Sequence, residues 1–249
     1  MLVCHRDMTL FSFTASVQPV AVFPLNQFCS GLERANLATM SRVAWAPGVD
    51  GTPHGSIHLR QRTDSFIEIF NRTGSGLDTR TSITLLVHVF PMVNREPILS
   101  FQEDGLGVQI GQEGVVDQKG VLTVRFTWRD FAQPPALSKA VLNMITWNFI
   151  GASYDYESGI ARLWHDGNEV EAKFIGKKLA LATQFSIRMG ALATAGPALC
   201  FQGRVSELLI FAESLGRESV RAIGGIVPEG NAGIMHLEFL QQAQKNEKF

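Results

Sequence analysis

The stretch from Trp147 to Val170 constrains the fold more than any other part of the chain. It contains two apolar, strand-like runs, 147–154 and 159–165, and each is followed by a turn. The second turn holds Asp166-Gly167, and an Asp-Gly pair between apolar runs is a strong hairpin signal, because glycine tolerates the positive φ that such turns require. The stretch therefore predicts three consecutive antiparallel strands, the third covering residues 169–174.

Runs with the same alternation recur along the chain, separated by Gly, Pro and Asn clusters. The further expected strands are 17–25, 55–59, 65–71, 82–90, 97–102, 107–111, 121–129, 185–191 and 201–211. We expect residues 26–52 and 131–142 to be mostly loop and residues 212–223 to form a short helix. Many short strands without long intervening helices predict an all-β sandwich or barrel, not a parallel α/β sheet.

The composition limits the classes of function. The 249 residues include 22 Lys and Arg against 23 Asp and Glu, so the chain lacks the strong basic field of many nucleic-acid binders. A chain of this length buries ~70–75% of its unfolded surface, so it needs no metal or disulfide simply to hold a core. No apolar run reaches the ~18 residues that a membrane-spanning helix needs.

We expect three regions along the chain. Residues 1–16 carry charge and a moderately apolar run with Ser and Thr, so they are interpreted as a leader or a flexible N-terminus. Residues 17–223 hold the predicted strands and form the sandwich domain. Residues 224–249 are a C-terminal tail with good helix formers. The chain can equally be part of a longer protein.

Four short segments occur in an order that points to a known family. They are Val22-Phe23-Pro24-Leu25, Ser82-Ile83-Thr84-Leu85, the stretch from Trp147 through Tyr154-Asp155 and Gly159 to Ala161-Arg162-Leu163-Trp164-His165-Asp166-Gly167, and the run 201–211 followed by Ser214-Leu215. Together they resemble the laminin-G-like, concanavalin A-like jelly-roll domains, over about residues 17–223. The resemblance implies an all-β jelly-roll sandwich of two antiparallel sheets, one of them concave. It also implies an extracellular or secreted setting and the binding of glycans or proteins.

Motifs for catalysis are missing. Polysaccharide hydrolases of this fold use closely spaced carboxylates on one strand, because retaining hydrolysis needs two carboxyl groups ~5 Å apart. The nearest approach, Asp64 and Glu68, has the wrong spacing. The sequence has no Gly-x-Ser-x-Gly elbow, no His-Glu-x-x-His and no P-loop.

We therefore interpret the chain as a non-catalytic extracellular recognition module, lectin-like or adhesive, that binds a glycan or an extracellular protein. Two alternatives stay open. One is a structural domain within a larger receptor or matrix protein, with no ligand of its own. The other, less favoured, is a polysaccharide hydrolase.

Three polar residues on alternating strands are candidates for ligand contact: His88, Arg125 and Arg162. If Ile83 and Val87 face the core, His88 points away from it, toward the concave surface. An arginine can hold a carboxylate or sulfate group through two hydrogen bonds. The alternative for all three is an ordinary solvated or salt-bridged sheet face.

Asp155 and Asp166 are candidate ligands for calcium, which some members of the family bind. Calcium prefers several carboxylate and carbonyl oxygens, and Ser206 stands where those relatives have an aspartate in the last strand. The alternative for both residues is turn chemistry, since Asp side chains bond to nearby backbone in such reversals. Asn71 begins the sequon Asn71-Arg72-Thr73 and is a candidate glycosylation site.

The chain has three cysteines: Cys4, Cys29 and Cys200. In the family that it resembles, the first and last strands lie side by side and antiparallel. The resemblance therefore implies a Cys29–Cys200 disulfide, which would contribute ~4 kcal/mol in the chain-entropy model. Cys4 would then be free or bonded to another chain. If the protein stays inside the cell, two buried reduced thiols are the alternative.

Overall fold

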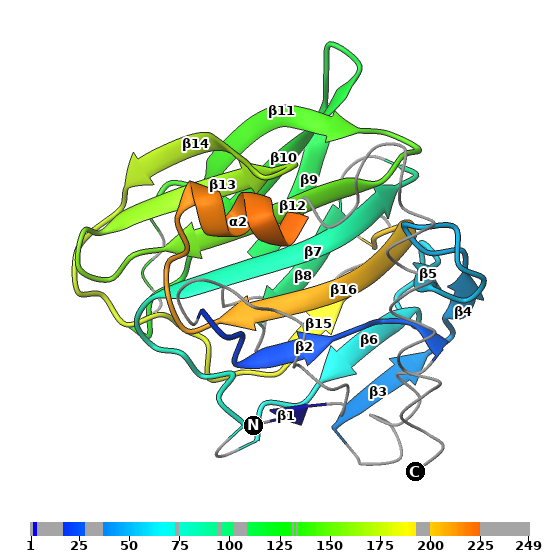
Figure 1. Ribbon diagram of the computed structural model, residues 1–249, viewed down its shortest axis with the longest axis horizontal. Helices are drawn as coiled ribbons and strands as arrows, with labels where there is room; N and C mark the ends of the chain where they lie inside the picture. Colours follow the sequence, from blue (N-terminus) through cyan, green and yellow to red (C-terminus); the bar gives the residue numbers. More distant parts are fainter. Residues whose placement is uncertain are drawn as a thin grey trace.

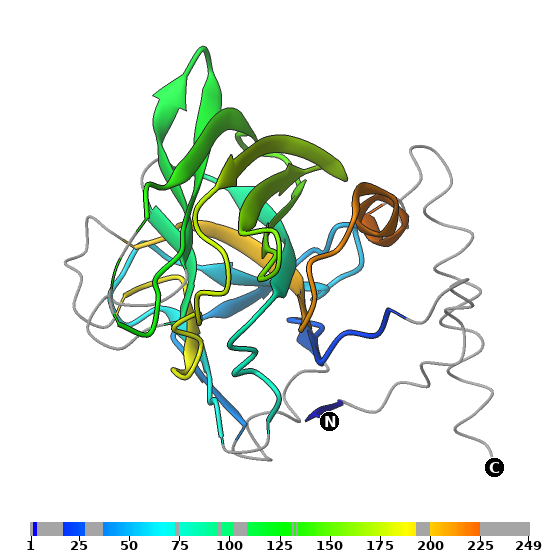
Figure 2. The same cartoon turned by 90° about the vertical axis from the view of Figure 1, so that its left-hand side faces the viewer.

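Two β-sheets packed face to face form the protein, as its computed structural model shows (Figures 1 and 2). The structure describes residues 2–3, 17–27, 37–72, 75–93, 96–101, 109–130, 132, 134–192 and 200–224. Within these residues one sheet, the large sheet, has nine strands and the other, the small sheet, has seven. Helix α2 (Arg217–Gly224) lies on the outer face of the large sheet.

The large sheet has the order β1-β2-β16-β7-β12-β13-β14, and β5 pairs with both β16 and β4. Its strands are β1 (Leu2–Val3), β2 (Ala21–Phe23), β4 (Ala44–Ala46), β5 (Ser56–Leu59), β7 (Ile83–Pro91), β12 (Asn148–Tyr154), β13 (Ile160–His165), β14 (Asn168–Phe174) and β16 (Gly203–Phe211). The small sheet has the order β11-β10-β9-β8-β15-β6-β3. Its strands are β3 (Ala38–Ser41), β6 (Phe66–Ile69), β8 (Glu96–Phe101), β9 (Gln109–Val116), β10 (Lys119–Arg125), β11 (Leu137–Asn143) and β15 (Ile187–Met189).

The beginning and the end of the sandwich lie side by side. β2 pairs antiparallel with β16, so that Phe23 is opposite Leu208 and Ala21 is opposite Ile210. Of the described strand pairs, β1 with β2 is parallel and the others are antiparallel. The predicted fold class is confirmed: the protein is an all-β, two-sheet antiparallel jelly-roll sandwich with a short C-terminal helix.

The predicted three-strand unit is confirmed as β12, β13 and β14. Its second turn has Asp166 at φ 47° and Gly167 at φ 73°, the left-handed geometry that an Asp-Gly pair favours. Asp166 also ties the turn to the sheet, because its Oδ1 accepts a hydrogen bond of 2.9 Å from the Phe149 backbone N–H. The turn residues therefore set the register of the whole unit.

The main core lies between the two sheets. Ile83, Leu85, Val87 and Val89 alternate along β7 and are fully buried, as the period of two predicts. The small sheet meets them with alternate residues of its own strands, such as Leu122 and Val124 of β10. Full burial of an aliphatic side chain of this size contributes ~1.5–3 kcal/mol, so this core is the main source of stability.

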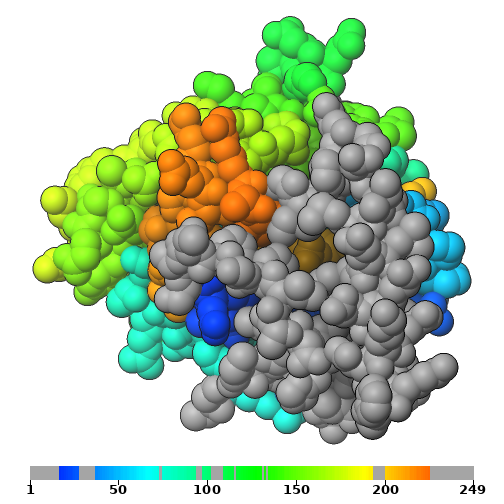
Figure 3. Space-filling view, viewed as in Figure 1, coloured from blue at the N-terminus to red at the C-terminus, as the bar shows by residue number. Residues whose placement is uncertain are grey.

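A second apolar cluster covers part of the outer face of the large sheet. Leu86, Trp164 and Phe211 from three strands pack against Leu215 and Val220, which belong to the segment after β16. Figure 3 shows this segment, in orange, beside the yellow-green β13 and β14. The part of this sheet face under the segment after β16 is therefore covered by the chain itself.

One of the loop predictions is wrong: residues 131–142 contain most of β11. Residues 26–52 were expected to be mostly loop, and their described part also contains the short strands β3 and β4. These runs are short and rich in Ala, Ser and Lys, which have low strand propensity on their own. Their strand structure comes from pairing: β3 adds to β6, and β11 adds to β10. The hairpin turn at Asp117 and Gln118, both at positive φ, lies between the expected strands 107–111 and 121–129, in a segment to which no structure was assigned.

No helix in the part of the chain that the structure describes is long and apolar enough to cross a membrane.

Candidate functional site

The outer face of the small sheet carries a hollow of about 430 Å³. Its walls include Gln109 and Glu113 of β9, Thr123 and Arg125 of β10, Pro97 of β8, and Leu192. In the sheet register Gly111 lies between Pro97 and Thr123, and because glycine has no side chain the surface is open at that point. A volume of this size falls in the ~300–1,000 Å³ range of small-ligand sites.

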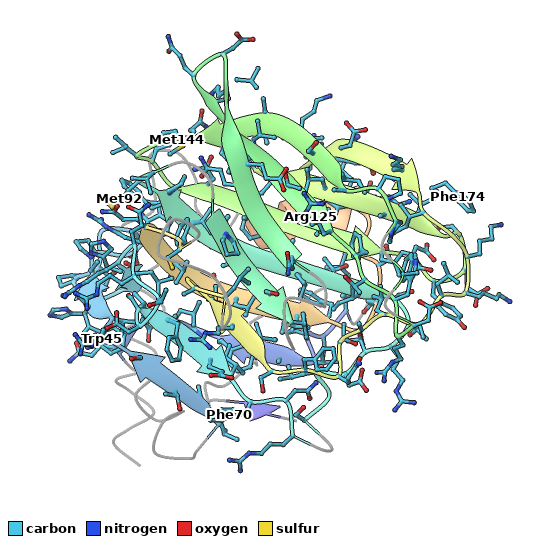
Figure 4. All side chains as sticks on the ribbon, turned by 180° about the vertical axis from the view of Figure 1, so that it is seen from behind. Trp45, Phe70, Met92, Arg125, Met144 and Phe174 are labelled. Atoms are coloured by element: carbon cyan, nitrogen blue, oxygen red, sulfur yellow. The ribbon has the colours of Figure 1, made fainter. Side chains whose placement is uncertain are left out.

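An ion pair stands at the side of this hollow. The Arg125 guanidinium donates to Glu113 Oε1, and the two side chains are 48% and 51% exposed. Arg125 lies near the middle of the small-sheet face in Figure 4. Because both members are accessible, a ligand with neighbouring hydroxyl groups can accept a hydrogen bond from Arg125 and donate one to Glu113.

Thr123 supplies a second polar group. It is 3% exposed, and its Oγ1 has no hydrogen-bond partner among the described residues. A buried hydroxyl without a partner costs ~1–3 kcal/mol, which a ligand group or a water in the hollow would recover. Thr123 therefore places a hydroxyl at the wall of the hollow whose oxygen is buried, so a ligand reaches it only when neighbouring atoms move.

The polar surface continues across the small sheet toward β6. Arg188 of β15 lies between Glu68 of β6 and Ser100 of β8 in the register. Its guanidinium stacks on the ring of Phe66, 3.7 Å from the ring centroid. Burial lowers the pKa of Arg188, and the charge of Glu68 opposes that shift. The open face of the small sheet thus presents two arginines with carboxylates near them.

The structure does not bring the three predicted ligand residues together. Arg125 lies on the small sheet, whereas His88 and Arg162 lie on the outer face of the large sheet. Arg162 pairs with Glu169 at 3.1 Å and donates to Ser214 Oγ at 3.4 Å. It therefore helps to hold the segment after β16 on the sheet, and a ligand role for it stays a prediction.

His88 points away from the core, as expected, but it is covered there. It is 7% exposed, and its ring centroid is 4.7 Å from that of Phe149. Burial lowers the pKa of His88 to about 4, against a smaller opposing effect of Asp166, so the ring is neutral at neutral pH. The nearest carboxylate oxygen, Glu207 Oε2, is 3.8 Å from His88 Nδ1. The covered ring acts in packing, and its contact with a ligand stays a prediction.

The two predicted calcium ligands lie at opposite ends of the β12–β13 pair. Asp155 follows β12, and its Oδ1 accepts hydrogen bonds from the backbone N–H of Glu157 and Ser158 at 3.0 and 3.2 Å. Asp166 follows β13 and accepts from Phe149. Among the described residues no group of three or more His, Cys, Asp or Glu is placed to hold a metal ion. Both aspartates accept hydrogen bonds from backbone N–H groups at turns, and calcium binding stays a prediction.

The other predicted sites concern Asn71 and the cysteines. Asn71 Nδ2, the atom that would carry a glycan, donates to Thr183 O at 2.8 Å, and Oδ1 accepts from Ser75 Oγ at 2.7 Å. Glycosylation of Asn71 therefore requires this contact to open. Cys200 is buried, whereas Cys29 and Cys4 lie outside the described residues, so the Cys29–Cys200 disulfide stays a prediction.

Sequence reasoning missed Glu113, Thr123 and Arg188. Arg188 alternates with Ile187 and Met189 in an expected strand, and this alternation was available as a signal. Thr123 carried the same signal, because it alternates with Leu122 and Val124 in the expected strand 121–129. Glu113 carried none, because the strand before it was expected to end at Gly111. Their meeting depends on the pairing of β9 with β10.

The fold and this face define a class: an antiparallel β-sandwich with a polar hollow on one open sheet. No family model matches the sequence, and no curated protein sequence matches it significantly. Solved structures do match the fold. The botulinum neurotoxin serotype G binding domain is similar with a TM-score of 0.64 and 12% identity, over 84% of this chain and 51% of that chain.

Two other binding domains are similar in the same way. That of Paraclostridial Mosquitocidal Protein 1 has a TM-score of 0.59 and 14% identity, over 76% of this chain and 47% of that one. That of botulinum neurotoxin DC, solved in complex with rat synaptotagmin II, has a TM-score of 0.58 and 10% identity, over 78% and 47%. The chain spans about half the length of these domains. At such identities the likeness shows the fold.

Proposed function

We propose that the protein is a non-catalytic recognition module that binds a glycan or protein ligand on the outer face of the small sheet. The observation that carries this proposal is the hollow with its accessible Arg125–Glu113 pair and the buried Thr123 hydroxyl. Polar groups that converge on a concave, partly apolar surface are typical of ligand sites. The proposal includes an extracellular setting and kinship with laminin-G-like, concanavalin A-like domains.

The similar structures support a binding role. All three are named as binding domains, and one of them holds synaptotagmin II. A protein or a glycan therefore fits the class of partner. Because fold alone does not determine function, the proposed binding role rests on the residues of the hollow.

The chemistry of the hollow argues against hydrolysis. Among its described lining residues Glu113 is the single carboxylate, and Arg125 pairs with it. A glycosidase needs two carboxyl groups, ~5–5.5 Å apart for retention or ~6.5–9.5 Å for inversion.

The test is binding to a glycan array and to a panel of extracellular proteins, with the same measurements on Arg125→Ala and Thr123→Val. Loss of a hydrogen bond to a charged group costs ~1.5–3 kcal/mol, so we expect Arg125→Ala to weaken binding roughly 10- to 100-fold. Lys173→Ala, an exposed substitution on β14 of the other sheet, is the matched control and should bind normally. Equal binding by all of these proteins would refute the assignment of the hollow. If no ligand binds at all, the structural-domain alternative takes its place.

A further inference from the structure

One end of the large sheet gathers apolar and cationic side chains from several strands. β7 ends there, and β16 and β12 begin there: Gly203 lies opposite Pro91 and Leu59, and Asn148 lies opposite Val89. Two backbone hydrogen bonds join the connecting turns, from Met92 N–H to Gln202 O at 3.0 Å and from Ile145 N–H to Pro91 O at 2.8 Å. We call this end, with Ile145, Trp147, Phe90, Arg204 and Arg60, the β7-end rim.

Ile145 is the most unusual residue of the rim. It is 69% exposed and has a φ of 55° in the turn between β11 and β12. A β-branched side chain is poorly suited to this left-handed conformation, where Asn or Gly fits without strain. The turn is otherwise well bonded, since Asn148 Nδ2 donates to Asn143 O and Thr146 O. The turn thus holds an aliphatic side chain that is exposed to solvent and whose backbone is conformationally strained.

A second exposed aliphatic residue lies close to Ile145. Val116, 51% exposed, is at the tip of the β9–β10 hairpin, which projects beyond the sheets in Figure 1. Lys119 pairs with both Val116 and Asn143, so Val116 is two strand spacings, ~10 Å, from the start of the Ile145 turn. Behind Ile145, the ring of Trp147 meets Phe90 edge-on at a centroid distance of 5.7 Å. Met92 and Met144 lie at the same end in Figure 4.

Arginines stand beside these apolar tips. The Arg204 guanidinium lies 4.8 Å from the ring centroid of Phe90, and Arg60 follows β5 directly. Neither forms an ion pair with a carboxylate among the described residues. Arg42 and Arg62 also lie at this end and share Asp64, at 3.0 and 2.9 Å. At the hairpin tip the exposed Lys119 balances the exposed Asp117, so Arg60 and Arg204, together with Arg42 and Arg62 on their one shared carboxylate, leave an excess of positive charge on this part of the described surface.

We propose that the β7-end rim docks on the surface of an anionic lipid bilayer. Ile145 and Val116 would enter the interfacial region, Trp147 would lie at the headgroup level, and Arg204 and Arg60 would contact lipid phosphates. Tryptophan is enriched at membrane interfaces, and arginines near an anionic leaflet are attracted to it. A bilayer accepts projecting apolar tips, whereas a protein partner needs a cavity shaped to receive them. This surface is separate from the hollow of the small sheet.

The experiment is co-sedimentation of the full chain with two kinds of vesicle, pure phosphatidylcholine and equimolar phosphatidylcholine and phosphatidylserine. We expect binding to the anionic vesicles alone, weakened at least tenfold by Ile145→Asn and clearly weakened by Arg204→Gln or by added salt. Ile145→Asn relieves the strained turn, so its melting temperature should not fall, and loss of binding cannot come from unfolding. The tryptophan emission of the native chain should shift to the blue with vesicles, and Trp147→Phe should remove that shift.

Phe174→Asn is the matched control. Phe174 is 63% exposed and lies on β14 at the opposite end of the large sheet, so this variant should bind vesicles like the native chain. Arg125→Ala in the hollow should also bind normally, which separates this proposal from the proposed function. Absence of binding to anionic vesicles, or equal losses for Ile145→Asn and Phe174→Asn, would overturn the proposal. Binding of an acidic peptide that depends on Ile145, without vesicle binding, would assign the rim to a protein partner instead.

Discussion

Protonation of His88 should destabilise the fold in mild acid. The ordinary imidazole pKa of 6.5 applies to the unfolded chain, whereas burial lowers the pKa of His88 to about 4 in the folded protein. Between these two values the unfolded state binds a proton that the folded state does not. The contribution of His88 to the free energy of unfolding is therefore fully present above about pH 6.5, and it is lost as the pH falls toward 4.

The size of the effect follows from the two pKa values. Each pH unit between them removes ~1.4 kcal/mol, so the His88 contribution approaches ~3 kcal/mol near pH 4. The groups that face His88 modify this figure slightly: Asp166 raises the pKa, Glu207 Oε2 lies 3.8 Å away, and Phe149 excludes water. Such a loss is a large fraction of the free energy of unfolding of a typical domain, which is ~5–15 kcal/mol.

The assay is urea unfolding of the native chain and of His88→Gln at a series of pH values from about 7 to about 4. His58 and His165 also have a pKa lowered by burial, so the native chain loses stability from several groups at once. The difference between the two curves isolates His88, and we expect the native chain to lose ~2–3 kcal/mol more than the variant. Parallel curves for the two proteins would refute the reasoning, because they would mean that His88 is accessible to protons in the folded state.

Three further predictions concern stability. Ile145→Gly should raise the free energy of unfolding by roughly 1 kcal/mol, because the left-handed φ of 55° costs an isoleucine ~1–2 kcal/mol; a lower melting temperature would contradict this. Asp166→Ala should cost ~1–2 kcal/mol through loss of the hydrogen bond to Phe149 N–H, and Asp166→Asn should restore most of it in the same denaturation assay. Leu215→Ala should cost ~2–5 kcal/mol and speed amide hydrogen exchange in α2 more than in β7, whereas uniform acceleration would show that the helix does not open separately.

The fold was predictable where local chemistry decides it. The β12–β13–β14 unit was predicted because Asp166 and Gly167 set a turn that few other residue pairs can form. β11 was missed because Leu137–Asn143 becomes a strand through pairing with β10, a contact that propensity does not record. Short strands beside a strong neighbour are therefore the weak point of a prediction from one sequence.

The candidate site was less predictable than the fold. The orientation of His88 could be predicted from its alternation along β7. The packing of Phe149 over the His88 ring could not, because it depends on tertiary structure. Arg125 was chosen from its strand position, yet its partner Glu113 comes from a strand whose length was underestimated. The hollow exists because Gly111 falls between Pro97 and Thr123, and that register is fixed by several long-range pairings.

The position of β16 also has a consequence for synthesis. This strand lies between β2 and β7 in the large sheet, although it comes after the other strands in the described sequence. During synthesis, most strands of the sandwich therefore leave the ribosome before β16, which pairs with both β2 and β7, is available. Until Phe211 emerges, β2 and β7 each present an unpaired edge, which is a template for aggregation. We expect the nascent chain to depend on chaperones up to that point, and to gain native structure in one late step.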